Sequence, residues 1–199
     1  MDALRKAKQE LELISKRAYH RGLTSGSGGN ISARVEGTEQ VVIKSSGLSF
    51  VDCTEENIIL VDLLGNVLDG SLTPSKEVKF HCGIYRVRPE VRAVVHTHSA
   101  AATAFSVVGR EIPMVTVSAA KGVGRIPLIG YAPPGSDELA KLVMEAFQDA
   151  TLKAALLQNH GVISVGKNLF ETLYLAEVVE DTAKITILAE GLGTALKFE

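Results

Sequence analysis

The chain has 199 residues, of which 46% are hydrophobic and 22% are charged, a balance typical of an ordinary globular protein. This length suits one domain with a sizeable core, so we expect residues 1–199 to form a single domain. The formal net charge of −2 provides no general attraction to nucleic acids or anionic membranes, which argues against both as partners.

The N-terminus and the cysteines predict the compartment. The opening stretch MDALRKAKQELELISKRAYHRG is charged throughout and lacks the apolar core of a secretory signal. Cys53 and Cys82 form no Cys-x-x-Cys pair, so reduced thiols are the simpler interpretation. No apolar run approaches the roughly 20 residues that a membrane-spanning helix requires. We therefore expect a cytoplasmic protein.

Hydrophobic periodicity predicts helices at both ends of the chain and strands between them. Helical spacing of apolar residues predicts helices over 4–18, 75–90, 100–109, 137–150 and 169–193. A glycine-rich turn within 24–35 leads into a short strand, and further strands are predicted over 41–47, 57–70 (a hairpin about Gly65 and Asn66), 91–99, 112–119, 126–131 and 154–166 (strand, turn, strand). This mixture indicates a layered α/β domain.

Two of the five histidines, His96 and His98, stand two positions apart at the end of the apolar run VVHTHS. Because residues i and i+2 of a strand point to the same face, both imidazoles can reach one point. They could be an exposed pair at a strand end, or two ligands of a metal. A catalytic metal needs three protein ligands and an open position.

His160, in the stretch QNHGVI at another apolar strand end, is the candidate for the third ligand. His20 lies at a charged helix end and is interpreted as a solvated or capping residue. His81 lies within the helix predicted over 75–90 and is interpreted as structural. Neither cysteine lies where it would obviously join the histidines, which argues against a closed, cysteine-rich structural zinc site.

One carboxylate and three small-residue turns complete the candidate site. Glu77 starts a helix, where it could simply favour the helix dipole or could serve the metal site as an acid or base. SGSGGN (25–30), SSG (45–47) and PSK (74–76) each read singly as ordinary turns. Together, their backbone N–H groups, hydroxyls and one lysine indicate a small anionic, phosphorylated substrate. The glycines match neither the dinucleotide nor the nucleotide-phosphate loop pattern.

The ordered set GSGGNIS, SSG, PSKE, VVHTHS and NHG resembles the class II aldolase family, and the resemblance covers nearly the whole chain. That family includes L-fuculose-1-phosphate aldolase and L-ribulose-5-phosphate 4-epimerase. The resemblance implies a single three-layer α/β domain with a central, mostly antiparallel sheet flanked by helices. It also implies a homotetramer.

The resemblance further implies how the site works. A divalent metal, usually Zn²⁺ with Mn²⁺ or Co²⁺ as alternatives, would be held by His96, His98 and His160, and Glu77 would be the catalytic acid/base. Phosphate would be held by residues of the three turns, namely Ser27, Gly29, Asn30, Ser46, Gly47, Ser75 and Lys76. The expected reaction is retro-aldol cleavage of a ketose 1-phosphate to dihydroxyacetone phosphate and an aldehyde, with the metal stabilising the enediolate.

Departures from the family pattern keep other functions open. The fuculose aldolase has a tyrosine proton donor in the stretch that here reads IPMVTVSAAKG and contains no tyrosine, and Tyr131 lies too far along the chain to be matched with it. Lys76 resembles family members that act on acid-sugar phosphates, so decarboxylation of a 3-oxo-tetronate 4-phosphate-like substrate is the alternative. Epimerases carry aspartate where this chain has Glu77, which makes pentulose 5-phosphate 4-epimerisation the weaker alternative. A family member that had become a non-enzymatic scaffold should have lost one of four residues, His96, His98, His160 or Glu77. All four are present, which argues against a scaffold.

Overall fold

The computed structural model describes residues 2–194. Its eight strands form one sheet in the order β4-β3-β2-β1-β5-β8-β7-β6, and every neighbouring pair is antiparallel except the parallel pair β6 and β7. The strands are β1 (Asn30–Arg34), β2 (Val41–Lys44), β3 (Ile58–Val61), β4 (Val67–Asp69), β5 (Ala93–Thr97), β6 (Leu128–Ile129), β7 (Ala154–Leu157) and β8 (Gly161–Gly166). The predicted mostly antiparallel sheet is confirmed.

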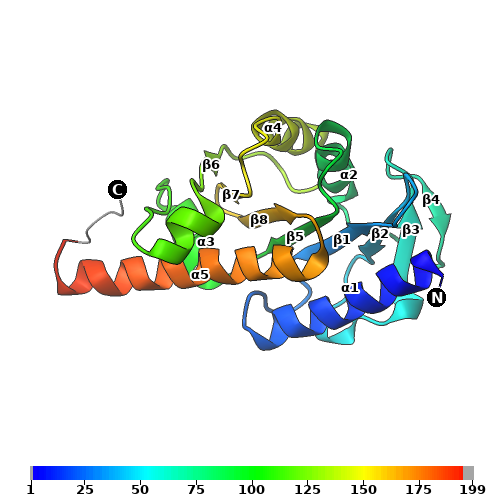
Figure 1. Cartoon of the computed structure of the whole chain (residues 1–199), viewed down its shortest axis with the longest axis horizontal. Coiled ribbons are helices and arrows are strands. Elements are labelled where there is room, and N and C mark those ends of the chain that lie inside the picture. Colours follow the sequence, from blue (N-terminus) through cyan, green and yellow to red (C-terminus); the bar gives the residue numbers. More distant parts are fainter. Residues whose placement is uncertain (1, 195–199) are drawn as a thin grey trace.

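Helices cover both faces of the sheet and make three layers (Figure 1). The helices are α1 (Ala3–His20), α2 (Val78–Val87), α3 (Ala100–Val107), α4 (Asp137–Phe147) and α5 (Leu169–Leu192). Helices α2 and α4 pack on one face, whereas α1, α3 and α5 pack on the other. None of the described helices is long and apolar enough to cross a membrane.

Strand alternation divides β5 between the two cores. Val94 points into the core under α2 and α4, and Ala93 and Val95 point towards α1 and α5. His96 therefore emerges on the α2 side, at the end of a strand that lies between β1 and β8. The pattern that buries the strand also brings His96 next to α2.

One predicted strand is wrong. Residues 112–119 (IPMVTVSA) pair with no strand, and the chain goes on into a short π-helix, Ala119–Val123. Ile112 and Met114 pack instead on the apolar core formed with α3 and α5. A run of apolar residues can satisfy this packing without any ladder of hydrogen bonds, so periodicity alone misleads here.

Candidate metal and substrate site

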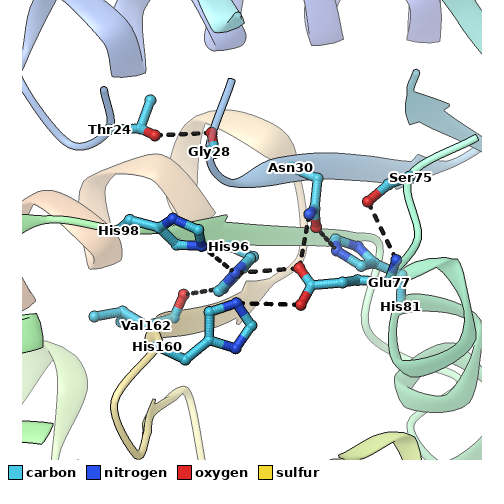
Figure 2. A network of polar contacts seen from close by, with 10 residues as sticks. All are labelled: Thr24, Gly28, Asn30, Ser75, Glu77, His81, His96, His98, His160 and Val162. Atoms are coloured by element: carbon cyan, nitrogen blue, oxygen red, sulfur yellow. Dashed lines mark hydrogen bonds and ion pairs between the residues drawn. The ribbon is translucent and has the colours of Figure 1, made fainter. Parts of the chain in front are cut away.

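Three histidines converge at one end of the sheet (Figure 2). His96 is on β5, His98 is the first residue after that strand, and His160 lies in the turn that joins β7 to β8. Their possible ligand atoms all lie within 4.8 Å of one another, and the two Nε2 atoms of His96 and His98 are 3.0 Å apart. We call these three residues the histidine cluster.

The hydrogen bond of His96 fixes which of its nitrogens is free. Its Nδ1–H donates to the carbonyl of Val162 over 2.9 Å, so Nε2 carries a lone pair and no proton. That Nε2 faces the Nε2 of His98 at 3.0 Å and the Oε2 of Glu77 at 3.2 Å. Lone pairs and a carboxylate gathered in this way repel one another unless a proton or a cation lies between them. The donor set therefore fits a divalent metal such as zinc.

Burial keeps the cluster in the protonation state that binds metals. Desolvation holds the pKa of His96 well below its usual value, and the neighbouring His98 and His160 lower it further. Burial also lowers the pKa values of His98 and His160, although the charge of Glu77 opposes that shift in both. Neutral imidazoles are the form that coordinates a cation.

Tight backbone packing brings the cluster together. A Cβ atom on Gly161 would lie 2.3 Å from the carbonyl oxygen of Thr97, and one on Gly28 would lie 2.7 Å from Nδ1 of His98. Asn159, just before His160, adopts a left-handed conformation with φ of 56°, which asparagine tolerates better than most residues. The signals for this packing, a glycine after His160 and an asparagine before it, are visible in the sequence.

Glu77 lies at the N-cap of α2, but its side chain makes no capping hydrogen bond. Its Oε2 accepts a hydrogen bond of 2.8 Å from Nδ2 of Asn30, and its Oε1 lies 3.2 Å from Nε2 of His160. Within the described part of the chain, Oε1 is buried and has no hydrogen-bond partner. The carboxylate thus faces the cluster, with Oε2 held by Asn30 and Oε1 beside His160 without a hydrogen bond.

The three small-residue turns are connected to the cluster in different ways. In 25–30, Gly28 packs against His98, and Asn30 pairs with His96 in the sheet. The other two turns are joined to each other by backbone hydrogen bonds from Ser46 N to Thr73 O and from Ser75 N to Lys44 O.

The side chains named in the turns differ in exposure. The residues expected to hold phosphate include exposed positions (Ser27, Gly47, Lys76), a half-buried one (Ser46) and buried ones (Gly29, Asn30, Ser75). The Oγ of Ser75 accepts from the backbone N–H of Glu77 over 3.3 Å, which links the third turn to the carboxylate. The first turn thus lies against the histidines, the third is tied to Glu77, and the second is joined to the third.

The other two histidines lie outside the cluster. His20 is exposed and contacts the carbonyl of Lys16 within α1. His81 is fully buried and contacts Asn30, which in turn holds Glu77 (Figure 2). Tyr131 is 60% exposed, and its backbone N–H donates to the side chain of Gln158, two residues before His160.

A buried glutamate on α5 was missed by the sequence reasoning. Both carboxylate oxygens of Glu180 accept backbone N–H groups at the start of α3, Ala101 at 3.2 Å and Ala102 at 2.9 Å. Helix α3 begins two residues after His98, so Glu180 anchors the segment that leaves the cluster. A single charged residue on the apolar face of a long helix was the available signal.

Comparison with known proteins identifies the family. Residues 9–187 match the family described as Class II Aldolase and Adducin N-terminal domain. The chain belongs to the class II aldolase family. Its resemblance to this family, its three-layer fold and its assignment as a lyase are confirmed, and the family chemistry is metal-dependent.

Individual relatives share much of this sequence and fold. The chain is 37% identical over 179 residues to the L-fuculose phosphate aldolase of Methanococcus maripaludis, covering 90% of this chain and 95% of the relative. It is 33% identical over 190 residues to the 5-deoxy-D-ribulose 1-phosphate aldolase of Bacillus thuringiensis, covering 96% and 88%. A solved L-fuculose 1-phosphate aldolase superposes with a TM-score of 0.91 at 31% identity, covering 98% and 91%. Each of these relatives is named for a phosphorylated sugar.

Proposed function

We propose that this class II aldolase cleaves a ketose 1-phosphate resembling L-fuculose 1-phosphate into dihydroxyacetone phosphate and an aldehyde. The observation that carries the proposal is the buried, unpartnered Oε1 of Glu77 beside three converging neutral histidines. Retro-aldol cleavage needs a stabiliser of negative charge on oxygen and a group that moves a proton at carbon. The three histidines could hold a metal ion that stabilises the negative charge, and Glu77 could move the proton.

The metal would be held by His96, His98 and His160, and zinc is the ion that we propose because three nitrogen ligands suit it. When bound, it supplies a Lewis acid for the carbonyl and hydroxyl oxygens of the substrate. Glu77 would carry the proton to and from the carbon next to the carbonyl. Its Oε1 is the oxygen for this role, because Oε2 is held by Asn30.

The three turns would hold the phosphate. Backbone N–H groups and hydroxyls of Ser27, Gly29, Asn30, Ser46, Gly47 and Ser75 can bind phosphate oxygens, and Lys76 can supply a positive charge. Their binding energy acts away from the reacting carbons and orients the substrate over the cluster.

We also propose that the chain works as a homotetramer in the cytoplasm. Large apolar side chains are exposed where α3 ends and along the second half of α5, including Val108 at 65% and Leu188 at 68%. Such surfaces are typical of subunit contacts. Both cysteines are free and buried, as expected for a reducing compartment. Light scattering of the purified protein tests the assembly.

A substrate screen tests the proposed reaction. The zinc-loaded protein is incubated with L-fuculose 1-phosphate, 5-deoxy-D-ribulose 1-phosphate and related ketose 1-phosphates, and dihydroxyacetone phosphate is measured by a coupled assay. We expect release from at least one of them. No release from any, with metal bound, would contradict the proposal.

Lys76 supports a second candidate reaction. It is exposed between Ser75 and Glu77, where a lysine could bind the carboxylate of an acid-sugar phosphate. Decarboxylation of a 3-oxo-tetronate 4-phosphate would then release carbon dioxide. Measuring carbon dioxide from this substrate in the same screen separates the two reactions.

A further inference from the structure

His81 is the one fully buried histidine outside the cluster, and the proposed mechanism assigns it no role. It lies on α2, one turn after Glu77, and its ring stacks on that of Phe80. Burial holds the pKa of His81 well below its ordinary value, so the ring is neutral and has one N–H donor and one acceptor nitrogen. Which nitrogen carries the proton follows from its neighbours.

A continuous chain of hydrogen bonds runs through this ring. The Oδ1 of Asn30 contacts Nε2 of His81, the Oγ of Ser32 lies 2.7 Å from Nδ1, and the hydroxyl of Tyr85 lies 2.8 Å from the same Oγ. At the other end, Nδ2 of Asn30 donates to Oε2 of Glu77 over 2.8 Å. Of the five residues that these hydrogen bonds connect, Glu77 is the most exposed, at 6%.

Along this series of hydrogen bonds, the donors and acceptors can be assigned in only one way. The amide N–H₂ of Asn30 donates to Glu77, so the carbonyl of Asn30 is the group that faces His81. The Nε2 of His81 must then carry the proton, and its Nδ1 must accept from Ser32. The oxygen of Ser32 is left to accept from Tyr85, whose pKa is raised by burial so that it keeps its proton.

We propose that His81 is a positioning residue that holds the Asn30 side chain in place through its carbonyl and thereby reserves Oε1 of Glu77 for proton transfer. Without the donor from His81, the carbonyl of Asn30 is left without its buried partner, and the side chain can shift away from the carboxylate. Glu77 then loses a charge-assisted hydrogen bond and its defined orientation. This inference rests on the proposed role of Glu77 as the acid/base.

Two amide substitutions at one position test the proposal. In His81→Gln the amide nitrogen can occupy the place of Nε2 and still donate to Asn30, whereas in His81→Asn the shorter amide occupies the place of Nδ1 and leaves Asn30 without its donor. We expect His81→Asn to lower kcat by ~10–100-fold, as loss of an outer partner of a metal site typically does, with KM nearly unchanged. His81→Gln should keep most of the activity.

Two further measurements separate positioning from simple structural damage. Both zinc-loaded variants should bind one zinc per chain, as the unmodified protein should. Crystal structures should show the Asn30 amide and the Glu77 carboxylate displaced only in His81→Asn. Equal kcat in the two variants, or an undisplaced Glu77 in His81→Asn, would overturn the proposal. If the unmodified protein cleaves no ketose phosphate but the two structures differ as expected, only the proposed reaction fails.

A pair of serine substitutions offers a milder test. Ser32→Ala removes the donor that holds Nδ1 of His81, so kcat should fall severalfold. Ser164→Ala is the matched control, because its hydroxyl is equally buried and has no hydrogen-bond partner among the described residues. It should leave kcat unchanged. Equal kcat for Ser32→Ala and the unmodified protein would argue against the directed chain.

Discussion

In the histidine cluster His96 is buried, His98 and His160 are half-buried, and side-chain contacts hold the three together. The turns at 45–47 and 74–76 are more exposed and are held together by backbone hydrogen bonds. His96 contacts His98, Glu77 and Val162 at once. In the turns, Gly47 and Lys76 face solvent. The contrast indicates that the residues proposed for catalysis depend on the folded core. The residues proposed for phosphate binding can change with little effect on the fold. The predictions below test that contrast.

The largest effect is expected from His98→Ala. The variant loses one of the three proposed ligands, so its metal affinity should fall by more than the ~100-fold that loss of an outer partner can cost. Activity should disappear, because the Lewis acid is gone. Metal analysis after dialysis and a thermal melt by circular dichroism measure both properties. A chain that is stably folded yet inactive supports a catalytic metal, whereas collapse of the fold would favour a structural one.

Glu77→Gln should separate chemistry from metal binding. Glutamine keeps the shape of the side chain and an oxygen for Asn30, but it cannot carry a proton. We expect kcat to fall by ~10²–10⁴-fold, the usual contribution of a positioned acid or base. Zinc content should stay near that of the unmodified protein. Near-normal kcat in this variant would remove Glu77 from the proposed role.

Two glycine substitutions compare the regions through stability. In Gly161→Ala the new Cβ would meet the Thr97 carbonyl at 2.3 Å, so the free energy of unfolding should fall by about 3 kcal/mol. In Gly47→Ala nothing lies within 4 Å of the new Cβ, and only its φ of 76° is unfavourable, at about 1 kcal/mol. Urea unfolding of the two apoproteins measures the difference. Equal losses would show that the turn is as constrained as the cluster.

The smallest effect is expected from Lys76→Met. This exposed residue contributes to binding alone, so KM for the cleaved ketose phosphate should rise by about tenfold or less with kcat unchanged. Steady-state kinetics at two salt concentrations checks this, because a charge contact weakens as salt increases. A large fall in kcat instead would place Lys76 among the groups that act on the reacting atoms.

Period-two geometry explains why the histidine cluster could be anticipated from sequence. His96 and His98 share one face at the end of a strand, and His160 marks the end of another apolar strand, so both signals are local. The helices and most strands follow from the same periodicity. The exception, 112–119, has strand-like composition but packs its apolar residues on the α3 and α5 core.

The contacts that join distant parts of the chain could not be anticipated in the same way. Asn30 meets His81 across 51 positions, and Glu180 meets Ala101 across 79. Asn30 was expected to bind phosphate, and its contact with Glu77 came from the structure. Sequence pattern says which face of a helix is buried, but it does not say which polar group on that face finds which partner.

The contact of Glu180 with the start of α3 has a consequence for how the protein matures. His98 and α3 are synthesised long before α5, yet the backbone N–H groups of Ala101 and Ala102 gain their partner Glu180 when α5 packs against α3. The complete metal grip is then a late product of folding, assembled after the last helix has docked. Zinc binding during refolding would therefore follow, rather than precede, the burial of α5. The time at which zinc binds would then report when folding is complete.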